Sequence, residues 1–403
     1  MTTADGSFMP LGPHLVNLRN GRLTAGGLAS TTAEDVDRIF EVHLPRFIAE
    51  HPDSPVPLMF WAHGGLVPER TGLAAAAHHV PWWLANGVYP VYFVWETGLL
   101  QALGTRIRQG IDRLRPAVPV EEAADQFVEW IARHAGGRSV WADLKAAAAR
   151  SDDRADGPSP IAYDGDGAAG DAGPGAEAGD GRPDVVEVGD AGPDAVEVGV
   201  GTDEGGARYV ARKLAEFLRQ NPGTVTLHAV GHSAGAIFHS YFLRAAFEEG
   251  VPAFESIIFL DPAILIEEFK RDIVPRTGNG VQALSTFALG KQRALDDECK
   301  LLNITFYNKS LLYLVHHALE DEEDAPLLGL QENVEADPVL REMFGGADPR
   351  IQAIWSPQLD GPWDSRSDAR EHAGIDSEAV TMESVARRIT GQEKIESFPG
   401  ILP

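Results

Sequence analysis

Apolar residues follow two alternating patterns along most of this chain. Short, nearly continuous apolar runs have the length and composition of buried strands; they lie at 57–62, 88–95, 225–230 and 254–260. Between them, apolar positions recur every three or four residues, as in amphipathic helices, at 71–87, 206–223, 236–250 and 377–390. This alternation predicts an α/β fold: a single domain over residues 1–403 with a mostly parallel central sheet and helices on both faces.

The N-terminal part of the chain carries two local signals. Asn20-Gly21 stands between apolar runs and predicts a hairpin that supplies the first strands of the sheet. Thr31 and Glu34 have the spacing of a capping box before a helix over about 32–50, which Pro45 is expected to bend or shorten.

Three segments exceed what a minimal fold of this class requires. Residues 99–150 contain two or three amphipathic patterns and predict a helical cap or side lobe. Residues 151–203 are rich in Gly, Asp, Ala and Pro and predict a disordered acidic insert; a calcium-binding repeat is the alternative, but the spacing does not match the nonapeptide pattern. Residues 264–300 are expected to form either a mobile lid or a fixed surface helix.

Composition narrows the class of protein. The net charge of the 403 residues is -26, and residues 151–205 carry about half of it, which argues against nucleic acid or an anionic membrane as a partner. No apolar window of about eighteen residues predicts a membrane span, and the start of the chain does not resemble a secretory signal. Cys299 is the only cysteine, which excludes an internal disulfide and favours a cytoplasmic location. No spacing of ligand residues predicts a metal or cofactor.

The most informative motif is Gly231-His232-Ser233-Ala234-Gly235. It follows a predicted strand and precedes a predicted helix, which is the setting in which G-x-S-x-G forms a nucleophile elbow. Glycines on both sides allow the sharp turn that would expose the Ser233 hydroxyl. The alternative is a chance pentapeptide in a glycine-rich chain, but the strand before it and the helix after it favour a functional serine.

A second motif lies upstream, where the run at 57–62 ends in His63-Gly64-Gly65. With the elbow, this segment resembles the α/β-hydrolase superfamily over about 57–100 and 204–390. The resemblance implies an α/β-hydrolase fold and an oxyanion hole formed by the backbone N–H groups of Gly65 and Ala234. The alternative is an ordinary turn at a strand end. His63 is expected to be a structural hydrogen-bonding residue rather than a proton shuttle.

The resemblance also implies a general base after the last strand. The run at 350–357 is expected to be that strand, and the helix at 377–390 should begin at a cap provided by Asp376 or Ser377. His372 is the only histidine in the loop between them, so we expect it to be the base.

The acid of the implied triad has several candidates. Asp261 follows the strand at 254–260, and its Leu-Asp-Pro-Ala segment resembles that of pancreatic-type lipases. In most of the superfamily the acid lies one strand later, here expected at 301–310, which ends without a carboxylate. Asp261 is our prediction, and Asp296 and Asp297 are the alternatives; Asp261 could also be purely structural.

These residues together predict a serine esterase or lipase-like hydrolase that needs no cofactor and acts on a small ester or lipid through an acyl-enzyme. Glu96 could line the pocket. A different class of function is a binding or regulatory protein on an incompetent hydrolase scaffold. Association with a lipid surface through Trp82-Trp83 is a further alternative, although tryptophans on such a helix are usually buried. The oligomeric state is left open by the sequence.

Overall fold

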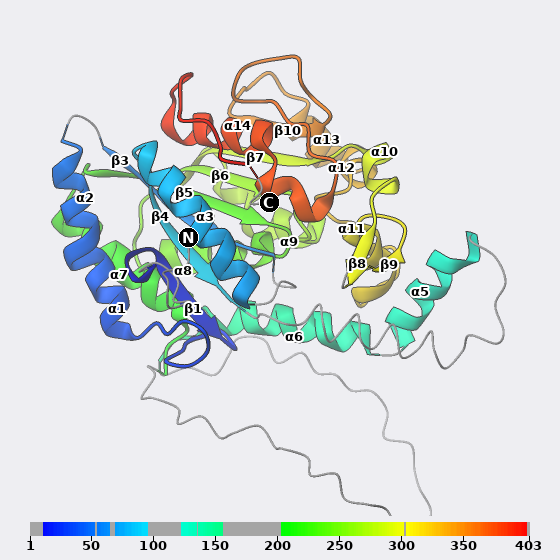
Figure 1. Ribbon diagram of the computed structural model, residues 1–403, viewed down its shortest axis with the longest axis horizontal. Helices are drawn as coiled ribbons and strands as arrows, with labels where there is room; N and C mark the ends of the chain where they lie inside the picture. Colours follow the sequence, from blue (N-terminus) through cyan, green and yellow to red (C-terminus); the bar gives the residue numbers. More distant parts are fainter. Residues whose placement is uncertain are drawn as a thin grey trace, which may run out of the picture.

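The computed structural model describes residues 11–52, 55–64, 69–95, 122–134, 136–155, 203–301 and 304–400. Eight strands form the central sheet in the order β10-β7-β6-β5-β3-β4-β1-β2 (Figure 1). Their bounds are β1 Leu15–Arg19, β2 Arg22–Leu23, β3 Val56–Ala62, β4 Tyr89–Val94, β5 Val225–His232, β6 Phe254–Leu260, β7 Val281–Leu289 and β10 Ile351–Ser356. Only β2 pairs antiparallel; the other strands are parallel to their neighbours. The predicted α/β fold with a mostly parallel sheet is confirmed.

Helices cover both faces of the sheet (Figure 1). One face carries α3 (Glu69–Ala85) and α14 (Ala379–Thr390), and the other carries α7 (Gly206–Gln220) and α8 (Gly235–Glu248). The strands between these layers are almost wholly buried, as their continuous apolar runs predicted. Because parallel strands end at one common edge, residues that follow β3, β5 and β6 come close together in space.

The N-terminal hairpin is confirmed, and its turn explains its sequence. Asn20 and Gly21 have φ angles of 53° and 77°, the left-handed values that a two-residue hairpin turn requires. The following helix does begin with a capping box, but it is formed by Thr32 and Asp35 rather than by Thr31 and Glu34. Thr31 is buried and accepts a hydrogen bond from the Asn17 backbone instead.

The helix predicted over 32–50 continues past Pro45 through a change of helix type. The order is α1 (Ala33–Arg38), a π-helical turn η2 (Ile39–His43) and α2 (Leu44–Glu50). Pro45 lies in the first turn of α2, where its missing N–H has the least effect on intrahelical hydrogen bonds.

The segment 264–300, expected to form a mobile lid or a fixed surface helix, contains both helices and a strand of the central sheet. Residues 281–289 form β7, which pairs with β6 on one side and β10 on the other. Short apolar runs cannot be assigned to helix or strand by periodicity alone, and here burial in the sheet decides. The rest of the 264–300 segment includes α9 (Ile266–Asp272) and α10 (Lys291–Leu295).

The strand expected at 301–310 is not part of the central sheet. It corresponds to β8 (Cys299–Leu301) and β9 (Ile304–Tyr307), a separate two-stranded hairpin. It is followed by α11 (Leu311–Leu314) and a π-helical turn, η4 (Val315–Leu319). Further short helices before β10 are α12 (Gln331–Ala336) and α13 (Pro338–Phe344). The sheet strand that follows β6 is therefore β7, which changes where an acid is to be sought.

The predicted helical insertion contains α5 (Glu122–His134) and α6 (Gly137–Arg150), which pack against each other and against η4. Glu96 and residues 97–121 lie outside the described residues, as do residues 156–202 of the predicted disordered insert. Residues 151–153, which we placed in that insert, are buried instead. The Asp152 carboxylate binds the guanidinium groups of Arg208 and Arg244, which anchors the end of α6 to α7 and α8.

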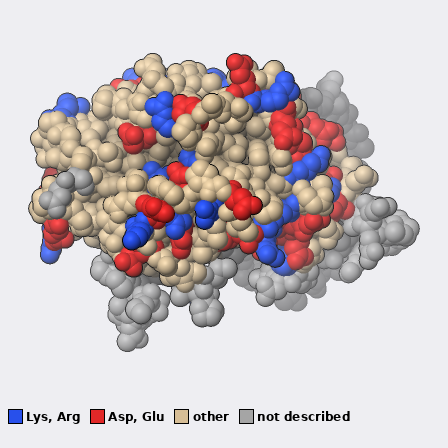
Figure 2. All heavy atoms as spheres, turned by 90° about the horizontal axis from the view of Figure 1, so that it is seen from above, with Lys and Arg blue, Asp and Glu red and all other residues tan. Residues whose placement is uncertain are grey.

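Both tryptophans considered for lipid contact are buried. The Trp83 indole donates to the Tyr92 hydroxyl, and that of Trp82 donates to the Glu396 carbonyl. Among the described residues, none of the helices combines the length and apolar character needed to cross a bilayer. On the face seen in Figure 2, acidic and basic side chains are intermixed rather than gathered by sign.

Candidate active site

Ser233 lies in the tight turn between β5 and α8, at the carboxyl edge of the sheet. Its φ of 54° is unusual for a residue with a side chain and costs on the order of 1–2 kcal/mol. Three backbone hydrogen bonds hold the turn: the Ser233 N–H donates to Leu260, and the Ser233 carbonyl accepts from Ala236 and Ala263. The serine is thereby fixed beside the end of β6.

The two glycines of the motif are required by close packing. A methyl group added at Gly235 would stand 2.1 Å from the Ala62 carbonyl oxygen, and one at Gly231 would stand 2.8 Å from the Gly235 backbone. The elbow is therefore pressed against the end of β3. That packing also places Gly64 beside the Ser233 side chain, since a methyl group at Gly64 would lie 3.1 Å from its Cβ.

Gly235→Ala is expected to lower the free energy of unfolding by about 2 kcal/mol or more, because the contact is with backbone that can yield only by shifting β3 or α8. Urea unfolding checks this. Gly12→Ala is the control, since nothing lies within 4 Å of its added methyl group. Equal stability of both variants would contradict the packing described for the elbow.

His372 and Asp261 complete a hydrogen-bonded chain with Ser233. His372 Nε2 lies 3.0 Å from Ser233 Oγ, and His372 Nδ1 lies 3.0 Å from Asp261 Oδ2. All three side chains are buried. The structure thus brings together the three predicted residues, which are separated by up to 139 positions in the chain.

Asp261 is held in its own tight turn after β6, with a φ of 45°. Its N–H donates to the Phe287 carbonyl, and its Oδ1 accepts the Leu289 N–H from the end of β7 at 3.0 Å. Oδ2 is left to face His372. Because β7 supplies these contacts, the strand that the sequence analysis missed is what orients the carboxylate.

Asp296 and Asp297, the two alternative candidates for the acid, make different contacts. Asp297 Oδ2 accepts the backbone N–H of His372 at 2.9 Å and does not contact its ring. Burial raises the pKa of Asp297, and the hydrogen bond from the His372 N–H partly offsets this. Asp296 Oδ1 accepts from Gln292 on the surface of α10. Asp261 is therefore the carboxylate placed to orient the imidazole.

The predicted oxyanion donors are only partly described. Ala234 caps the N-terminus of α8, and no acceptor for its N–H is found among the described residues, as expected for the first amide groups of a helix. Gly65 lies outside the described residues. His63, two residues before Gly65, is buried, which lowers its pKa to about 4, and its ring nitrogens contact the Gly64 carbonyl and the Trp95 N–H. These contacts fit the structural role expected for His63.

A second His–Asp pair, formed by His232 and Asp376, lies next to His372. His232 Nδ1 is 3.4 Å from Asp376 Oδ2, and the His232 and His372 ring centres are 5.2 Å apart. Burial disfavours the charged forms of His232 and Asp376, but the attraction between the two charges outweighs the effect of burial. The pKa of His232 is therefore raised, and that of Asp376 falls to about 2. Asp376 had been predicted only as a candidate helix cap; the cap of α14 is Glu378.

The pair should make stability pH-dependent. The lowered pKa of Asp376 stabilises the folded state fully above its ordinary pKa of about 4, and this stabilisation is lost as the pH falls through about 2. The raised pKa of His232 stabilises the folded state below about pH 6.5, and this stabilisation is lost as the pH rises through the raised pKa. Asp376→Asn is therefore expected to cost about 2 kcal/mol near pH 5 and less near pH 2. Urea unfolding at both values tests this; a pH-independent cost would contradict it.

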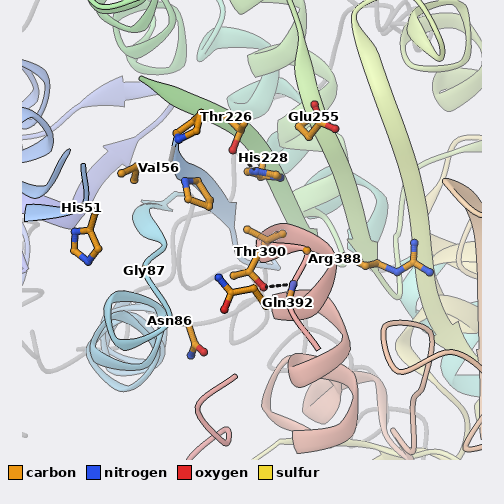
Figure 3. A pocket seen from close by; sticks show the side chains of 14 residues that line it. His51, Val56, Asn86, Gly87, Thr226, His228, Glu255, Arg388, Thr390 and Gln392 are labelled. Atoms are coloured by element: carbon orange, nitrogen blue, oxygen red, sulfur yellow. Dashed lines mark hydrogen bonds between the residues drawn. The ribbon is translucent and has the colours of Figure 1, made fainter. Parts of the chain in front are cut away.

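Two of the cavities among the described residues are lined largely by polar or charged side chains. One, of about 370 Å³, is lined by Arg293, Asp296, Asp297, Glu298, Arg370 and Glu371, the last of which immediately precedes His372 in the chain. The larger, of about 560 Å³, is shown in Figure 3 with Val56, Thr226 and Glu255 at its wall. These residues belong to the amino ends of β3, β5 and β6, so this cavity lies roughly 20 Å along β5 from Ser233. It is not the place for a substrate of Ser233.

The described residues contain one cluster with the residue types of a metal site: His316, His317 and Asp324. His317 Nδ1 lies 2.6 Å from Asp324 Oδ1, closer than two ligands of one zinc ion usually approach, while His316 Nε2 is 4.0 Å from that oxygen. Bonds to zinc of about 2 Å at tetrahedral angles separate ligand atoms by roughly 3.3 Å. The cluster fits a hydrogen-bonded histidine–aspartate pair better than a metal site.

Comparison with known proteins adds no assignment to this geometry. No protein-family model, no curated protein and no solved structure matches the chain. What the site can do is therefore inferred from its distances, burial and charges.

Proposed function

We propose that this chain is a serine hydrolase of carboxylic esters with an α/β-hydrolase fold. The observation that carries the proposal is the continuous chain of hydrogen bonds from Ser233 through His372 to Asp261, with both links at 3.0 Å. Its position adds support, because Ser233 stands in a positive-φ turn at the carboxyl edge of a parallel sheet, where α/β proteins bind ligands.

The geometry assigns a role to each atom of the reaction. As Ser233 Oγ bonds to the ester carbonyl carbon, its proton passes to His372 Nε2. The carbonyl electrons move to oxygen, and this oxyanion would be stabilised by the N–H groups of Ala234 and Gly65. Collapse breaks the bond to the alcohol, which takes the proton from His372. Water then attacks the acyl-enzyme by the same route, releasing the acid and restoring Ser233.

Asp261 determines which nitrogen of His372 can accept that proton. Its Oδ2 faces Nδ1, so Nδ1 carries the hydrogen and the Nε2 lone pair is directed at Ser233. As the imidazole becomes charged in the transition state, the buried carboxylate stabilises it. The Leu289 N–H on Oδ1 keeps the carboxylate in this orientation.

The alternative of an incompetent binding protein has lost its main support. It relied on the missing carboxylate at the end of residues 301–310, but that segment lies in the β8–β9 hairpin, outside the central sheet. Asp261 reaches His372 from the end of β6 without it. The spacing of the three side chains instead favours catalysis.

Hydrolysis of p-nitrophenyl esters tests the proposal. We expect the purified chain to release p-nitrophenol from at least one member of a series from acetate to laurate, and the preferred chain length would define the acyl pocket. Ser233→Ala protein prepared in parallel is the control for contaminating esterases. Absence of turnover across the whole series, or equal turnover by the control, would contradict the proposal.

A further inference from the structure

His232, the residue immediately before Ser233, contacts the main chain of His372. Its Nε2 lies 3.0 Å from the His372 carbonyl oxygen, while its Nδ1 faces Asp376 at 3.4 Å. The His232 ring is buried, and the Asp376 side chain is 15% exposed. His232 therefore links His372, the proposed base, to the strand β5 that leads to Ser233.

Both partners of His232 are hydrogen-bond acceptors only. A backbone carbonyl never donates, and a carboxylate donates only when it is protonated, which the low pKa of Asp376 opposes. A neutral imidazole has one N–H and can satisfy one of the two acceptors. An imidazolium has two N–H groups, one for each acceptor, so the two contacts together favour a positively charged His232.

The main chain of His372 is held from two sides. Asp297 accepts its N–H at 2.9 Å, and His232 donates to its carbonyl at 3.0 Å. Neither group hydrogen-bonds to the His372 ring, whose nitrogens face Ser233 and Asp261. The two contacts fix the backbone from which the imidazole projects and leave the ring free for proton transfer.

We propose that His232 and Asp376 form a charged pair that positions His372 through its backbone carbonyl, so that the ester hydrolysis proposed above requires a protonated His232. This rests on the proposed function. His232 acts through His372 and is a positioning residue, not one that contacts the reacting atoms.

The groups that surround the pair fit a single buried cation between two carboxylates. From the neighbouring elements, His232 is faced by Asp376, Asp261, His372 and His63, and Asp376 is also faced by His79 on α3 and Tyr92 on β4. Burial lowers the pKa values of His63 and His79 to about 4 and raises that of Tyr92. These three are therefore neutral near pH 7.

Loss of the His232 proton would break one of its two contacts, because a nitrogen lone pair would then face an oxygen lone pair. The loop would be less well held, and a small displacement of a catalytic group can cost up to about 100-fold in rate. We therefore expect kcat to decline on the alkaline side as His232 deprotonates.

The charge on His232 can be observed directly. In the full chain with ¹⁵N-labelled histidine, long-range ¹H–¹⁵N spectra should show both His232 nitrogens as protonated at about pH 6, with titration above the ordinary value of about 6.5. The signal is assigned by its loss in His232→Gln, or by its shift in Asp376→Asn if the first variant does not fold. A neutral His232 at about pH 6 would overturn the proposal.

Kinetics test the positioning role. His232→Ala should lower kcat by about 10- to 100-fold with KM little changed. His232→Gln keeps a donor toward the His372 carbonyl but cannot titrate, so it should restore most of kcat and abolish the alkaline decline. His228→Gln is the matched control, a buried histidine on the same strand that bonds Thr226 and Ser256. Wild-type pH profiles in both His232 variants would refute the role.

The two proposals fail in distinguishable ways. If the chain hydrolyses no ester, the proposed function fails, whereas the protonation state of His232 is still read from the spectra. If hydrolysis depends on Ser233 but His232 is neutral or its substitution leaves the pH profile unchanged, only the role of the pair is refuted.

Discussion

Ser233→Ala is expected to lower kcat for ester hydrolysis by about 10⁶-fold, with little change in KM. The reason is that the hydroxyl lies 3.0 Å from His372 Nε2 and no other hydroxyl is described at that nitrogen, so the variant has no oxygen to form the acyl-enzyme. Initial rates on the preferred p-nitrophenyl ester measure the loss. A residual rate about 10³-fold above water would reflect the oxyanion hole and binding alone.

Ser240→Ala provides the control for this prediction. Ser240 is also buried, on the helix that follows the elbow, and its hydroxyl donates only to the Ile237 carbonyl. We expect its kcat to stay within a few-fold of wild type. A Ser233→Ala variant that retains activity comparable to this control would show that Ser233 is not the nucleophile.

Asp261→Asn is expected to lower kcat by about 10⁴-fold while the protein stays folded. The Leu289 N–H fixes the orientation of the new amide, because it requires an acceptor at the Oδ1 position. The amide NH₂ group then faces His372 Nδ1 and can only donate to it. The imidazole must carry its hydrogen on Nε2, and it cannot accept the proton of Ser233.

Asp297→Asn is the control that separates the loss expected for Asp261→Asn from the effect of removing any negative charge near the site. Asp297 accepts two backbone N–H groups, from His372 and Glu298, so an amide loses one acceptor without touching the imidazole ring. We expect a loss of about 10-fold, and almost none for the exposed Asp296→Asn. A larger loss in Asp297→Asn than in Asp261→Asn would assign the acid to Asp297 instead.

The parts of the fold that follow from local patterns could be predicted from the sequence. The runs at 57–62, 225–230 and 254–260 have the length and composition of buried strands, and all three form the sheet centre. Their order along the chain also indicated which edge would gather Ser233 and Asp261. His372 followed from its position between the last strand and the last helix.

Other features depend on contacts that no local pattern encodes. β7 resembled a surface helix because its apolar run is bounded by glycines, and only its place between β6 and β10 makes it a strand. The spacing of Thr31 predicts a helix cap, but its hydroxyl instead accepts a hydrogen bond from the Asn17 backbone N–H. The contacts of His232 and Asp297 with the main chain of His372, and of Asp376 with the His232 ring, join segments that lie far apart in the chain.

Reaction with a fluorophosphonate probe tests the central claim most directly. The phosphorus should bond to Ser233 Oγ as fluoride leaves, and intact-protein mass spectrometry with peptide mapping should find one adduct, at Ser233. The adduct should be absent from Ser233→Ala and form slowly in Asp261→Asn. Labelling that persists in Ser233→Ala, or an unlabelled wild-type chain that is otherwise folded, would contradict the assignment of Ser233 as an activated nucleophile.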